Sequence, residues 1–552
     1  HLTFGGRIYG DNLVAGKTYT GIYTDTDFKG WSLKSRKPAQ EHQIRLALAT
    51  LQCENPADWE TMLNKTISKV QTDKKAKQKT RQWWNSYWKR SYVFIDSGKI
   101  GSDYWKVGRN YQLFRYMLGC NAYGSEPTKF NGGLFTFDPV HIDSTRVFTP
   151  DFRLWGGGTM TAQNQRLVYF PMLKSGDFDM MKPQFDFYER MLDNAKLRTK
   201  VYWNHEGACF SEQIENFGLP NLAEYDWKPR HEGFPVGVDS NPWLEYTWDT
   251  ALEFALMMFD AHLYNNEPIV PHLPFIESLL TFFDEHYSYL ALRRGTNKLD
   301  GDGHLVLYPG SACETYKMAT NATSTVAALK VITEKLLELP ELDATQREHW
   351  SGFLKRIPPI SYREVQGKKT ISPAKMWERI NNSEVPSLYP VYPWRIYGIG
   401  QPELQTAINT YLYDPEAIEF RSHIGWKQDN IFAACLGLTE EAERLTLLKL
   451  SDGPHRFPAF WGPGFDWTPD HNWGGSGMIG LQEMLLQTNG DSILLFPAWP
   501  ENRDVHFRLH APKQTTVEVT LRNNKIEFMQ VEPKTREKDI VICSSHFYLR
   551  RD

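Results

Sequence analysis

The chain has 552 residues and a formal net charge of −4. Its length exceeds what one minimal core needs, so we expect two or three domains. The near-neutral charge, without a large basic block, argues against a nucleic-acid partner. No apolar run reaches the length of a membrane span.

Aromatic residues and cysteines narrow the partner classes further. Aromatic residues make up 14% of the chain, with 19 Trp and 26 Tyr. Flat rings at this density fit either carbohydrate stacking or a large aromatic core. The six cysteines are scattered and form no CxxC pair, so neither a zinc site nor a disulfide framework is indicated. We expect no cofactor and no metal.

Residues 1–70 are predicted to form strands. Residues 16–24 are rich in Gly, Thr and Tyr, and residues 42–52 alternate apolar and polar side chains with the period of a half-buried strand. A segment of this size buries a sheet poorly. We therefore interpret it as the C-terminal part of an N-terminal β-sandwich and expect further strands before His1. No signal peptide is visible in the first residues.

Residues 71–91 are predicted to be a linker helix, because a run of basic side chains precedes an aromatic cluster that begins at Trp83. From residue 92 to residue 498 helical periodicity dominates, and loops rich in Gly, Pro and Trp separate the amphipathic segments. The predicted helices include residues 104–118, 180–197, 243–263, 273–287, 323–337, 402–412 and 430–436. Many helices joined by aromatic loops indicate an α/α toroid.

Residues 499–552 return to strand periodicity. Residues 506–511, 516–521 and 526–531 alternate with period two, and Asn523-Asn524 fits a hairpin turn. This pattern predicts a small C-terminal β domain. The expected fold class is a multi-domain α+β chain that is mainly α.

The stretch of residues 468–487 carries the first catalytic candidate. A polar, aromatic turn at residues 470–473 runs into Gly474 and Gly475, and an apolar helix pattern follows. The glycines would let a backbone or a ligand come close. Asp470, at the mouth of this helix, is either a catalytic carboxylate or an N-cap.

Glu253 is the second candidate, because it lies in the apolar run of residues 252–256. Burial there would raise the pKa of Glu253 toward what a general acid needs. Glu245, Asp249 and Glu253 follow one another at i, i+4 and i+8, which would put them on one face of a helix. That face is either a pocket wall or an exposed acidic stripe.

Three further carboxylates and one amide run are candidates. Asp429 enters an apolar helix pattern and is either an N-cap or a site residue. Glu212 and Glu314 lie in loops that precede helical patterns, where each has either a structural hydrogen-bonding role or a catalytic one. Residues 163–166, Gln-Asn-Gln-Arg, would hold a water or sugar hydroxyls, or satisfy loop backbone.

Other motifs are incomplete. His205-Glu206-Gly207 is not HExxH, so no zinc protease is indicated. Asp300-Gly-Asp-Gly lacks the remaining spacing of a calcium loop and is interpreted as a hairpin turn. Gly474-Gly-Ser-Gly-Met does not fit the nucleophile elbow of hydrolases.

Several blocks resemble glycoside hydrolase family 95. They are residues 127–135, 163–171, 470–487 and 494–500, of which the block that begins at Asp470 is the most specific. The match is closer to DUF5703-type proteins, which look like relatives of that family. The blocks typical of these proteins are residues 155–159, 175–183, 425–429 and 456–463. The resemblance covers nearly the whole chain.

The resemblance implies an N-terminal β-sandwich, an (α/α)6 barrel and a C-terminal β domain. It also implies an inverting exo-glycosidase of α-L-fucosides or α-L-galactosides, in which asparagine side chains position the water and an aspartate polarises them. Carried over, Asp470 matches that aspartate and Asn164 the second asparagine. Ala162 stands at the place of the first asparagine, so that Gln163, Gln165 or another group would have to fill it.

The acid implied by the resemblance is a glutamate on the helix after the asparagine segment. Glu253 is the match, and Asp249, Asp260 or Glu245 would be favoured by a different gap. The side chains expected to bind an oligosaccharide or polysaccharide substrate are Gln163, Gln165, Trp155, His205, Glu212, Glu314, Asp429, Trp461, His471, Asn472 and Trp473. A periplasmic or secreted location is also implied.

Two other functions fit an α/α toroid. A polysaccharide lyase would use Tyr202 or His205 as the base, with Arg166 neutralising a uronate, and its unsaturated product would absorb light. A non-catalytic glycan-binding protein would bind glycan without releasing sugar.

Overall fold

The computed structural model describes the chain except residues 1, 24, 122, 125, 130–144, 146–159, 221–231, 236, 455–456, 461–469 and 544–552. Contacts divide the chain into two compact units, His1–Lys89 with Asp138–Phe152, and Arg90–Phe137 with Arg153–Asp552. The division predicted from composition, 1–70, 71–91, 92–498 and 499–552, stays a prediction.

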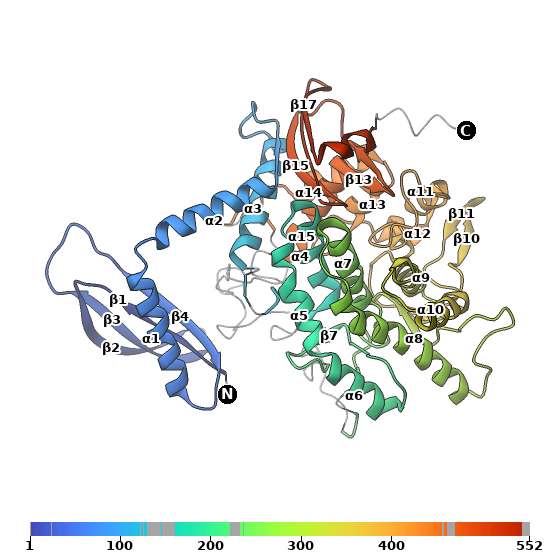
Figure 1. The fold of residues 1–552 in the computed structure, drawn as a ribbon, viewed down its shortest axis with the longest axis horizontal. Helices are drawn as coiled ribbons and strands as arrows, with labels where there is room; N and C mark the ends of the chain where they lie inside the picture. The colour runs from blue at the N-terminus through green and yellow to red at the C-terminus, as the bar shows by residue number, and fades with distance from the viewer. Residues whose placement is uncertain are drawn as a thin grey trace. The chain divides into compact units, whose positions relative to one another are not determined.

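The first unit contains two antiparallel β-ribbons (Figure 1). β1 (Leu2–Tyr9) pairs with β4 (Arg45–Gln52), and β2 (Leu13–Tyr23) pairs with β3 (Thr26–Ser35). The strands predicted within residues 16–24 and 42–52 are confirmed as parts of β2 and β4.

Two helices complete the first unit. α1 (Pro56–Thr72) begins where Asn55 accepts the Ala57 N–H at 2.7 Å. It packs on the β1–β4 ribbon, because the indole N–H of Trp59 donates to the Ala49 carbonyl at 3.0 Å. A helix, α2 (Ala76–Arg90), lies within the segment 71–91, and its role as a linker stays a prediction.

The second unit is mainly helical. Its helices are α3 (Asp103–Asn121), α4 (Ala162–Ser175), α5 (Lys182–Arg190), α6 (Leu192–Trp203), α7 (Thr250–Asn265), α8 (Leu273–Arg293), α9 (Thr323–Glu338), α10 (Ala344–Arg356), α11 (Leu404–Tyr413), α12 (Pro415–Glu419), α13 (Asp429–Cys435), α14 (Thr439–Lys449) and α15 (His471–Leu485). Five of the predicted helices are confirmed, as α3, α8, α9, α11 and α13.

Two predicted helices have different limits from those expected. The segment 180–197 is divided between α5 and α6, with Met191 as the C-cap of one and the N-cap of the other. Because Met191 keeps a right-handed helical backbone, the side-chain period continues across the break. The segment 243–263 becomes helical only at Thr250, since Tyr246 adopts a φ of 62°.

α4 lies at the centre of the packing between helices and contacts α7, α15 and the sheet strand β15. Pro171 in α4 has no N–H to give to the Leu167 carbonyl. That carbonyl faces Gly475 of α15, where a Cβ would collide with it. A Cβ on Gly474 would collide with the ring of Phe114 in α3. Gly474 and Gly475, which were predicted to let a backbone or a ligand come close, therefore allow the close approach of α3 and α4.

The strands of the second unit are short except near the C-terminus. They are β5 (Tyr92–Ile95), β6 (Met160–Thr161), β7 (Gln213–Ile214), β8 (Gly310–Ala312), β9 (Tyr316–Ala319), β10 (Tyr362–Val365), β11 (Lys368–Ile371), β12 (Arg379–Ile380), β13 (Leu486–Asn489), β14 (Ser492–Leu495), β15 (Val505–Ala511), β16 (Thr515–Arg522), β17 (Lys525–Glu532) and β18 (Ile540–Ile542).

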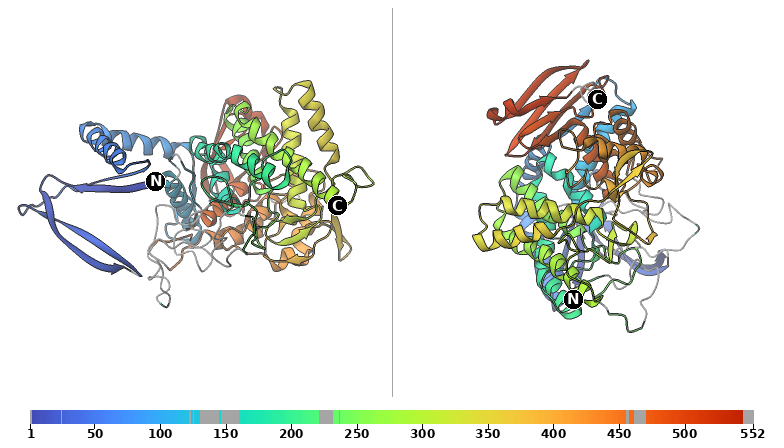
Figure 2. Two further views of the ribbon diagram at one scale, coloured as in Figure 1. Left: turned by 90° about the horizontal axis from the view of Figure 1, so that it is seen from below. Right: turned by 90° about the vertical axis from the view of Figure 1, so that its right-hand side faces the viewer.

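The strands predicted near the C-terminus form one four-stranded sheet in the order β17-β16-β15-β5. It makes a layer beside the helices (Figure 2). Asn523 and Asn524 join β16 to β17 with φ values of 48° and 58°, which confirms the predicted hairpin turn. Sequence periodicity did not predict that β5, far upstream, completes the sheet.

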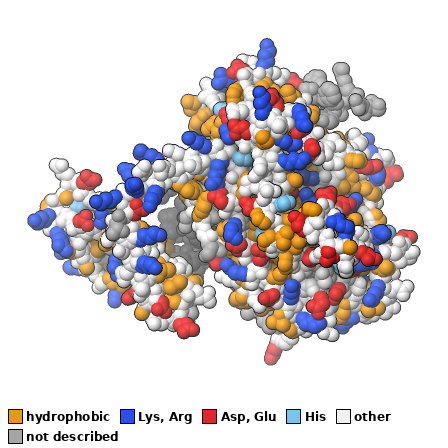
Figure 3. Space-filling view, viewed as in Figure 1, with side chains coloured by type: hydrophobic (Ala, Val, Ile, Leu, Met, Phe, Trp, Pro, Cys, Tyr) orange, Lys and Arg blue, Asp and Glu red, His pale blue; other side chains and the backbone are white. Residues whose placement is uncertain are grey.

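Basic and acidic side chains are interspersed on the face of the molecule drawn in Figure 3. Within the described ranges, no helix has the length and apolar character needed to cross a membrane.

Candidate active site

The first turns of several helices in the second unit bring polar side chains together. α4 begins where the Ala162 N–H donates to the Glu212 carbonyl at 2.8 Å, beside the short β6–β7 pairing. α7 and α9 meet at their starts, because Ser324 and Thr325 donate hydroxyls to Asp249 at 2.9 and 2.8 Å. Helix N-termini carry unpaired N–H groups and favour negative charge. Asp249 and Glu253 at the start of α7, and Asp470 at the start of α15, lie in this setting.

Glu253 in the first turn of α7 is buried against Arg166 of α4. The guanidinium of Arg166 donates to Glu253, to the Tyr389 hydroxyl at 2.6 Å and to the Gln163 carbonyl at 2.7 Å. Burial raises the pKa of Glu253 to about 7, although Arg166 acts in the opposite direction. The predicted upward shift of this pKa is thus found.

The space beside Glu253 is small. A cavity of about 10 Å³ is lined by Glu253, Gln163, Thr250 and Trp394, among others. Each of these four side chains has a buried polar atom without a hydrogen-bond partner among the described residues. A cavity of this volume holds roughly one water molecule. Among the described residues, Glu253 therefore faces a space of about the size of a water molecule.

The predicted acidic face holds only in part: Asp249 and Glu253 line the same small cavity, whereas Glu245 does not, because α7 begins only at Thr250. Asp249 is the N-cap, and Glu245 lies outside the helix in an ion pair with Arg379. Asp260 lies near the other end of α7 and pairs with Lys335 at 3.6 Å.

Three buried glutamates and one lysine form what we call the acid cluster: Glu212, Glu314, Glu384 and Lys317. Burial raises the pKa of Glu212 well above its ordinary value, and Glu314 and Glu384 add to the shift. Burial also raises the pKa of Glu314 to about 8, with Glu384 as the next cause. Burial lowers the pKa of Lys317.

The acid cluster has more carboxylates than compensating partners. Both oxygens of Glu212 lack a hydrogen-bond partner among the described residues. The Lys317 ammonium donates to the Glu245 carbonyl at 3.1 Å and to the Thr247 hydroxyl at 3.0 Å. Arg166 also acts on Glu212 and Glu384, and Lys427 acts on Glu384, but burial outweighs these cations and favours the protonated glutamates.

Glu314 lies in the tight turn between β8 and β9, where Cys313 has a φ of 53°. The Asn382 amide donates to Glu314 at 2.8 Å. Glu314 is 8% exposed, against 0% for Glu212 and 4% for Glu384. Of the three glutamates, Glu314 therefore has the most access to solvent.

Glu384 was not a candidate from the sequence. It accepts the Thr315 hydroxyl at 2.9 Å and the Trp426 indole N–H at 3.1 Å. No motif or periodicity marks it, because it lies in a loop between β12 and the helix α11. Glu384 is recognised only in the folded structure, where its loop folds against the β8–β9 turn.

A second charged group lies at the starts of α13 and α15. Burial raises the pKa of Asp429 to about 6 and lowers that of Lys449 to about 7. The Lys449 ammonium donates to three backbone carbonyls, of His423, Gly425 and Lys427, at 2.9, 3.0 and 2.7 Å. The N-cap of α13 is Gln428, so the capping alternative for Asp429 is wrong.

Asp470 is fully buried and caps α15, accepting the Asn472 N–H at 2.9 Å. Its charge acts on Lys449, which places it near the second charged group. The capping alternative is confirmed, and it leaves the catalytic prediction open because one carboxylate can do both.

The side chains that follow Asp470 have different surroundings. His471 is buried, and burial lowers its pKa to about 4, so the ring is neutral. Trp473 donates its indole N–H to the Lys449 carbonyl at 2.7 Å. The Asn472 amide oxygen is buried without a hydrogen-bond partner among the described residues.

Gln165 and Asn164, in the amide run at the start of α4, have different roles. Gln165 donates to the Thr128 carbonyl at 3.1 Å and to Gln184 at 2.9 Å, which is a structural position. Asn164 is half-buried, and its side chain makes no hydrogen bond with the described residues. It is therefore available to a ligand or a water molecule.

The remaining predicted residues lie elsewhere. His205 hydrogen-bonds His286 at 2.8 Å within an aromatic cluster, and Tyr202 accepts the Gly237 N–H at 3.0 Å. Neither makes a hydrogen bond with Arg166 within the described part of the chain, and the lyase stays an alternative. Trp155 and Trp461 lie outside the described residues.

The Asp300 loop is a turn, as predicted. Asp300 accepts the N–H groups of Asp302 and His304 at 3.0 and 2.8 Å. Potential ligand atoms of Asp300, Asp302 and His304 lie within 4.8 Å of one another. The hydrogen bonds explain the geometry without a metal.

Residues 1–93 match a family model described as a domain of unknown function, DUF5703. The expected DUF5703 likeness is thus present in the N-terminal part of the chain, whereas membership of glycoside hydrolase family 95 stays a prediction. No curated protein matches the sequence.

Among solved structures, the fold is similar to that of a protein assigned as a kojibiose phosphorylase from the human microbiome. The TM-score is 0.61 at 12% identity, over 95% of this chain and 73% of that chain.

Two other structures are less similar. A glycosidase in complex with glucose has a TM-score of 0.42 at 10% identity, over 69% of this chain and 97% of that one. A GH78 family rhamnosidase of Bacillus sp. GL1 has a TM-score of 0.43 at 11% identity, over 98% and 51%. Because both TM-scores are below 0.5, the fold comparison rests on the first structure alone.

Proposed function

We propose that this chain is a carbohydrate-active enzyme that hydrolyses O-glycosidic bonds, with the acid cluster at the centre of its active site. The observation that carries the proposal is the set of buried carboxylic acids with raised pKa values, Glu212, Glu253 and Glu314. Glycoside hydrolysis uses one carboxyl group that is protonated near neutral pH and a second group that handles water. A fold similar to that of a protein assigned as a sugar phosphorylase supports chemistry at a glycosidic bond, with the acceptor left to be decided.

We assign the general acid to Glu314. It is protonated at neutral pH because its pKa is raised to about 8, and it is the most exposed glutamate of the acid cluster. When it gives its proton to the leaving oxygen, the resulting carboxylate keeps the Asn382 amide and gains attraction from Lys317. Glu253, the acid matched by sequence, is the alternative, because its pKa is also raised, to about 7, and it faces a small cavity.

We propose that Asp470 and Asn164 orient and activate the water molecule that attacks the glycosidic bond. Asn164 has a side chain available for this, and Asp470 has a fixed position through its cap. By the resemblance to family 95, the enzyme would be exo-acting and inverting, would release an α-L-fucoside or α-L-galactoside type of sugar, and would have its helices in an (α/α)6 barrel. A periplasmic or secreted location belongs to the same proposal.

Water is favoured over phosphate as the acceptor. Phosphorolysis needs cations free to hold the phosphate. Near the acid cluster, Arg166 is paired with Glu253, and Lys427 and Lys449 donate to backbone carbonyls. Among the described residues, these cations already have partners.

The first test is a screen of aryl glycosides and of plant and algal oligosaccharides, with and without inorganic phosphate. Released monosaccharide and its anomeric form are followed by NMR. Free sugar with an inverted anomeric centre is the expected product. Sugar 1-phosphate, an unsaturated product, or no product from any substrate would contradict the proposal.

The acid assignment is tested with Glu314→Gln. We expect kcat/KM to fall by about 10²–10⁴-fold on substrates with poor leaving groups, because proton donation contributes that much. Activity on dinitrophenyl glycosides, whose leaving group needs no proton, should be largely kept. Glu206→Gln, the same change at an exposed site, is the control. If Glu253→Gln shows this leaving-group pattern and Glu314→Gln does not, the acid is Glu253.

The water-activating role of Asp470 is tested with Asp470→Asn. Turnover should fall by orders of magnitude on every substrate, activated or not, because water attack is required for both. The amide oxygen can still accept the Asn472 N–H, so folding should be intact by circular dichroism. Near-normal turnover in this variant would exclude the role.

A further inference from the structure

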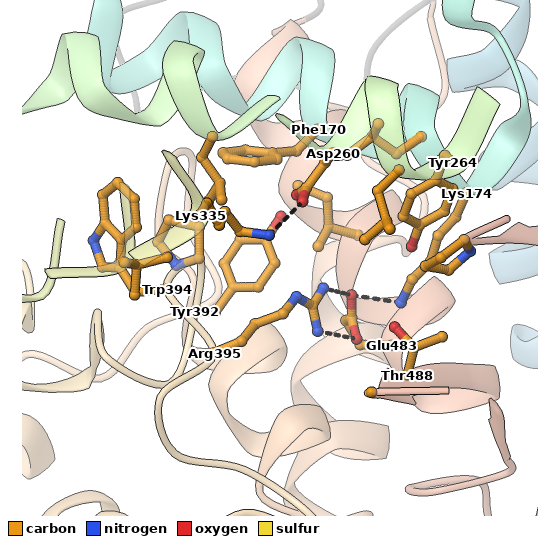
Figure 4. A pocket seen from close by; sticks show the side chains of 18 of the residues that line it. Phe170, Lys174, Asp260, Tyr264, Lys335, Tyr392, Trp394, Arg395, Glu483 and Thr488 are labelled. Carbon is orange, nitrogen blue, oxygen red and sulfur yellow. Dashed lines mark hydrogen bonds and ion pairs between the residues drawn. The ribbon is translucent and has the colours of Figure 1, made fainter. Parts of the chain in front are cut away.

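We propose that the second unit has a separate binding site for a neutral saccharide of one or two sugar rings, at the end of the helices opposite to the acid cluster. A cavity of about 420 Å³, here called the C-terminal cavity, lies at the ends of α4, α7, α9 and α15 (Figure 4). This volume falls in the range of roughly 300–1,000 Å³ that is usual for ligand pockets. None of the residues of the acid cluster lines it.

Three aromatic side chains form part of the cavity wall. Phe170, Tyr392 and Trp394 line it and are each almost fully buried. The rings of Phe170 and Tyr392 pack edge to face at 5.6 Å, so they are held in place by each other. Rigid aromatic rings next to polar groups suit sugar rings, which have apolar faces and hydroxyl edges.

Paired charges surround these rings. Glu483 accepts from Arg395 at 2.6 Å and pairs with Lys174 at 2.6 Å (Figure 4). Asp260 pairs with Lys335 at 3.6 Å across the cavity wall. Carboxylates with spare lone pairs and cations with spare N–H groups offer a hydroxyl both an acceptor and a donor.

The charge balance selects a neutral ligand. Three cations line the cavity, Lys174, Lys335 and Arg395, and four carboxyl groups line it as well, Asp260, Glu334, Glu338 and Glu483. The C-terminal ends of α4, α7, α9 and α15 carry partial negative charge, which adds to the charge of the carboxylates. The cations are therefore matched by negative charge, and a free anion would gain little there.

The pair Asp260–Lys335 provides a clean test. Both side chains are partly exposed, at 19% and 27%, so their removal costs little stability. We replace both, Asp260→Asn with Lys335→Met, which keeps the volume and the charge balance. The control carries the same changes in the exposed pair Lys182→Met with Asp186→Asn.

Binding is measured by isothermal titration of the full chain with D-glucose, L-fucose and lactose, and with benzoate as an anionic counter-ligand. We expect saturable saccharide binding by the wild type and the control. We expect at least a tenfold loss of affinity, or the loss of one site from the stoichiometry, in the Asp260/Lys335 variant. Val331→Phe, which fills the cavity, should have the same effect.

Three outcomes would overturn the proposal: no saturable binding of any of the three saccharides, binding that is unchanged in both the Asp260/Lys335 variant and Val331→Phe, or binding of benzoate alone. Hydrolytic activity is not needed for this readout. A failure of the proposed function thus stays distinguishable from a failure of the second site.

Discussion

Glu253 at the start of α7 and Glu483 near the end of α15 differ in one respect that decides their chemistry. Both are almost fully buried, at 3% and 1% exposure, and both accept an arginine. Burial raises the pKa of Glu253 to about 7. The pKa of Glu483 is lowered: burial acts to raise it, but Arg395 and Lys174 together act more strongly in the other direction.

The helix dipole would give the opposite result. It favours a carboxylate in the first turn, where Glu253 lies, and disfavours one in the last turns, where Glu483 lies. The direct partners decide instead. Glu483 has two cations, whereas Glu253 has one, Arg166, which also serves Tyr389 and the Gln163 carbonyl, and it has Asp249 close by. The same helices thus hold protonated carboxyl groups at one end and ion pairs at the other.

Neutralising each glutamate in turn is the strongest test of whether the direct partners explain the two pKa values. Glu483→Gln leaves the buried Lys174 and the half-buried Arg395 without their carboxylate and should destabilise the chain by about 3–5 kcal/mol, mostly through Lys174. Glu253→Gln should cost less, because Arg166 keeps its other two acceptors. Urea denaturation near pH 6 measures both. Equal losses would mean that the partners do not explain the two pKa values.

The pH dependence of stability tests the raised pKa of Glu253 separately. Between the ordinary glutamate pKa and about 7, the unfolded chain has lost a proton that folded Glu253 keeps. Stability should therefore fall as the pH rises through this window, by about 1.4 kcal/mol for each unit of pKa difference. In Glu253→Gln this part of the slope should disappear. Melting temperatures from pH 5 to pH 8 test it, and an unchanged slope in the variant would refute the shifted pKa.

The smallest effect is expected from two aspartates on α7. Asp249→Ala leaves the hydroxyls of Ser324 and Thr325 buried without their acceptor and should cost roughly 1–3 kcal/mol. Asp260→Ala removes a partly exposed pair and should cost about 1 kcal/mol or less. Denaturant midpoints of the two variants compare them directly. A larger loss for Asp260 would show that the C-terminal end depends on that pair more than its exposure implies.

Side-chain periodicity predicted five helices of the second unit, α3, α8, α9, α11 and α13, with nearly correct limits. The limits of α3, α9 and α13 agree with the predicted segments within a few residues, because amphipathic spacing persists along their length. It failed where the backbone turned without a change in spacing, at Met191, and where a left-handed residue, Tyr246, delayed the start of α7. Neither event alters the pattern of apolar positions.

The site was predicted less completely than the fold. Sequence reasoning singled out Glu212, Glu314 and Glu253 as separate candidates, but it could not bring Glu212 and Glu314 together in one cluster. Their proximity depends on the β6–β7 pairing and the β8–β9 turn, which join segments with no shared period. Glu384 and Lys317 were missed for the same reason. A buried cluster is formed by tertiary contacts, and local sequence patterns do not predict such contacts.

The pairing of β5 with β15 has a consequence for the order of folding. Ile95 pairs with Val505, more than 400 residues later in the chain. At a synthesis rate of about 5–20 residues per second, roughly 20–80 s pass between the appearance of the two strands. During that time the helices can form from local contacts, while β5 presents an unpaired edge of the kind that aggregates. The four-stranded sheet is therefore completed after most of the helical unit has been made, and β5 is the segment that most needs protection until then.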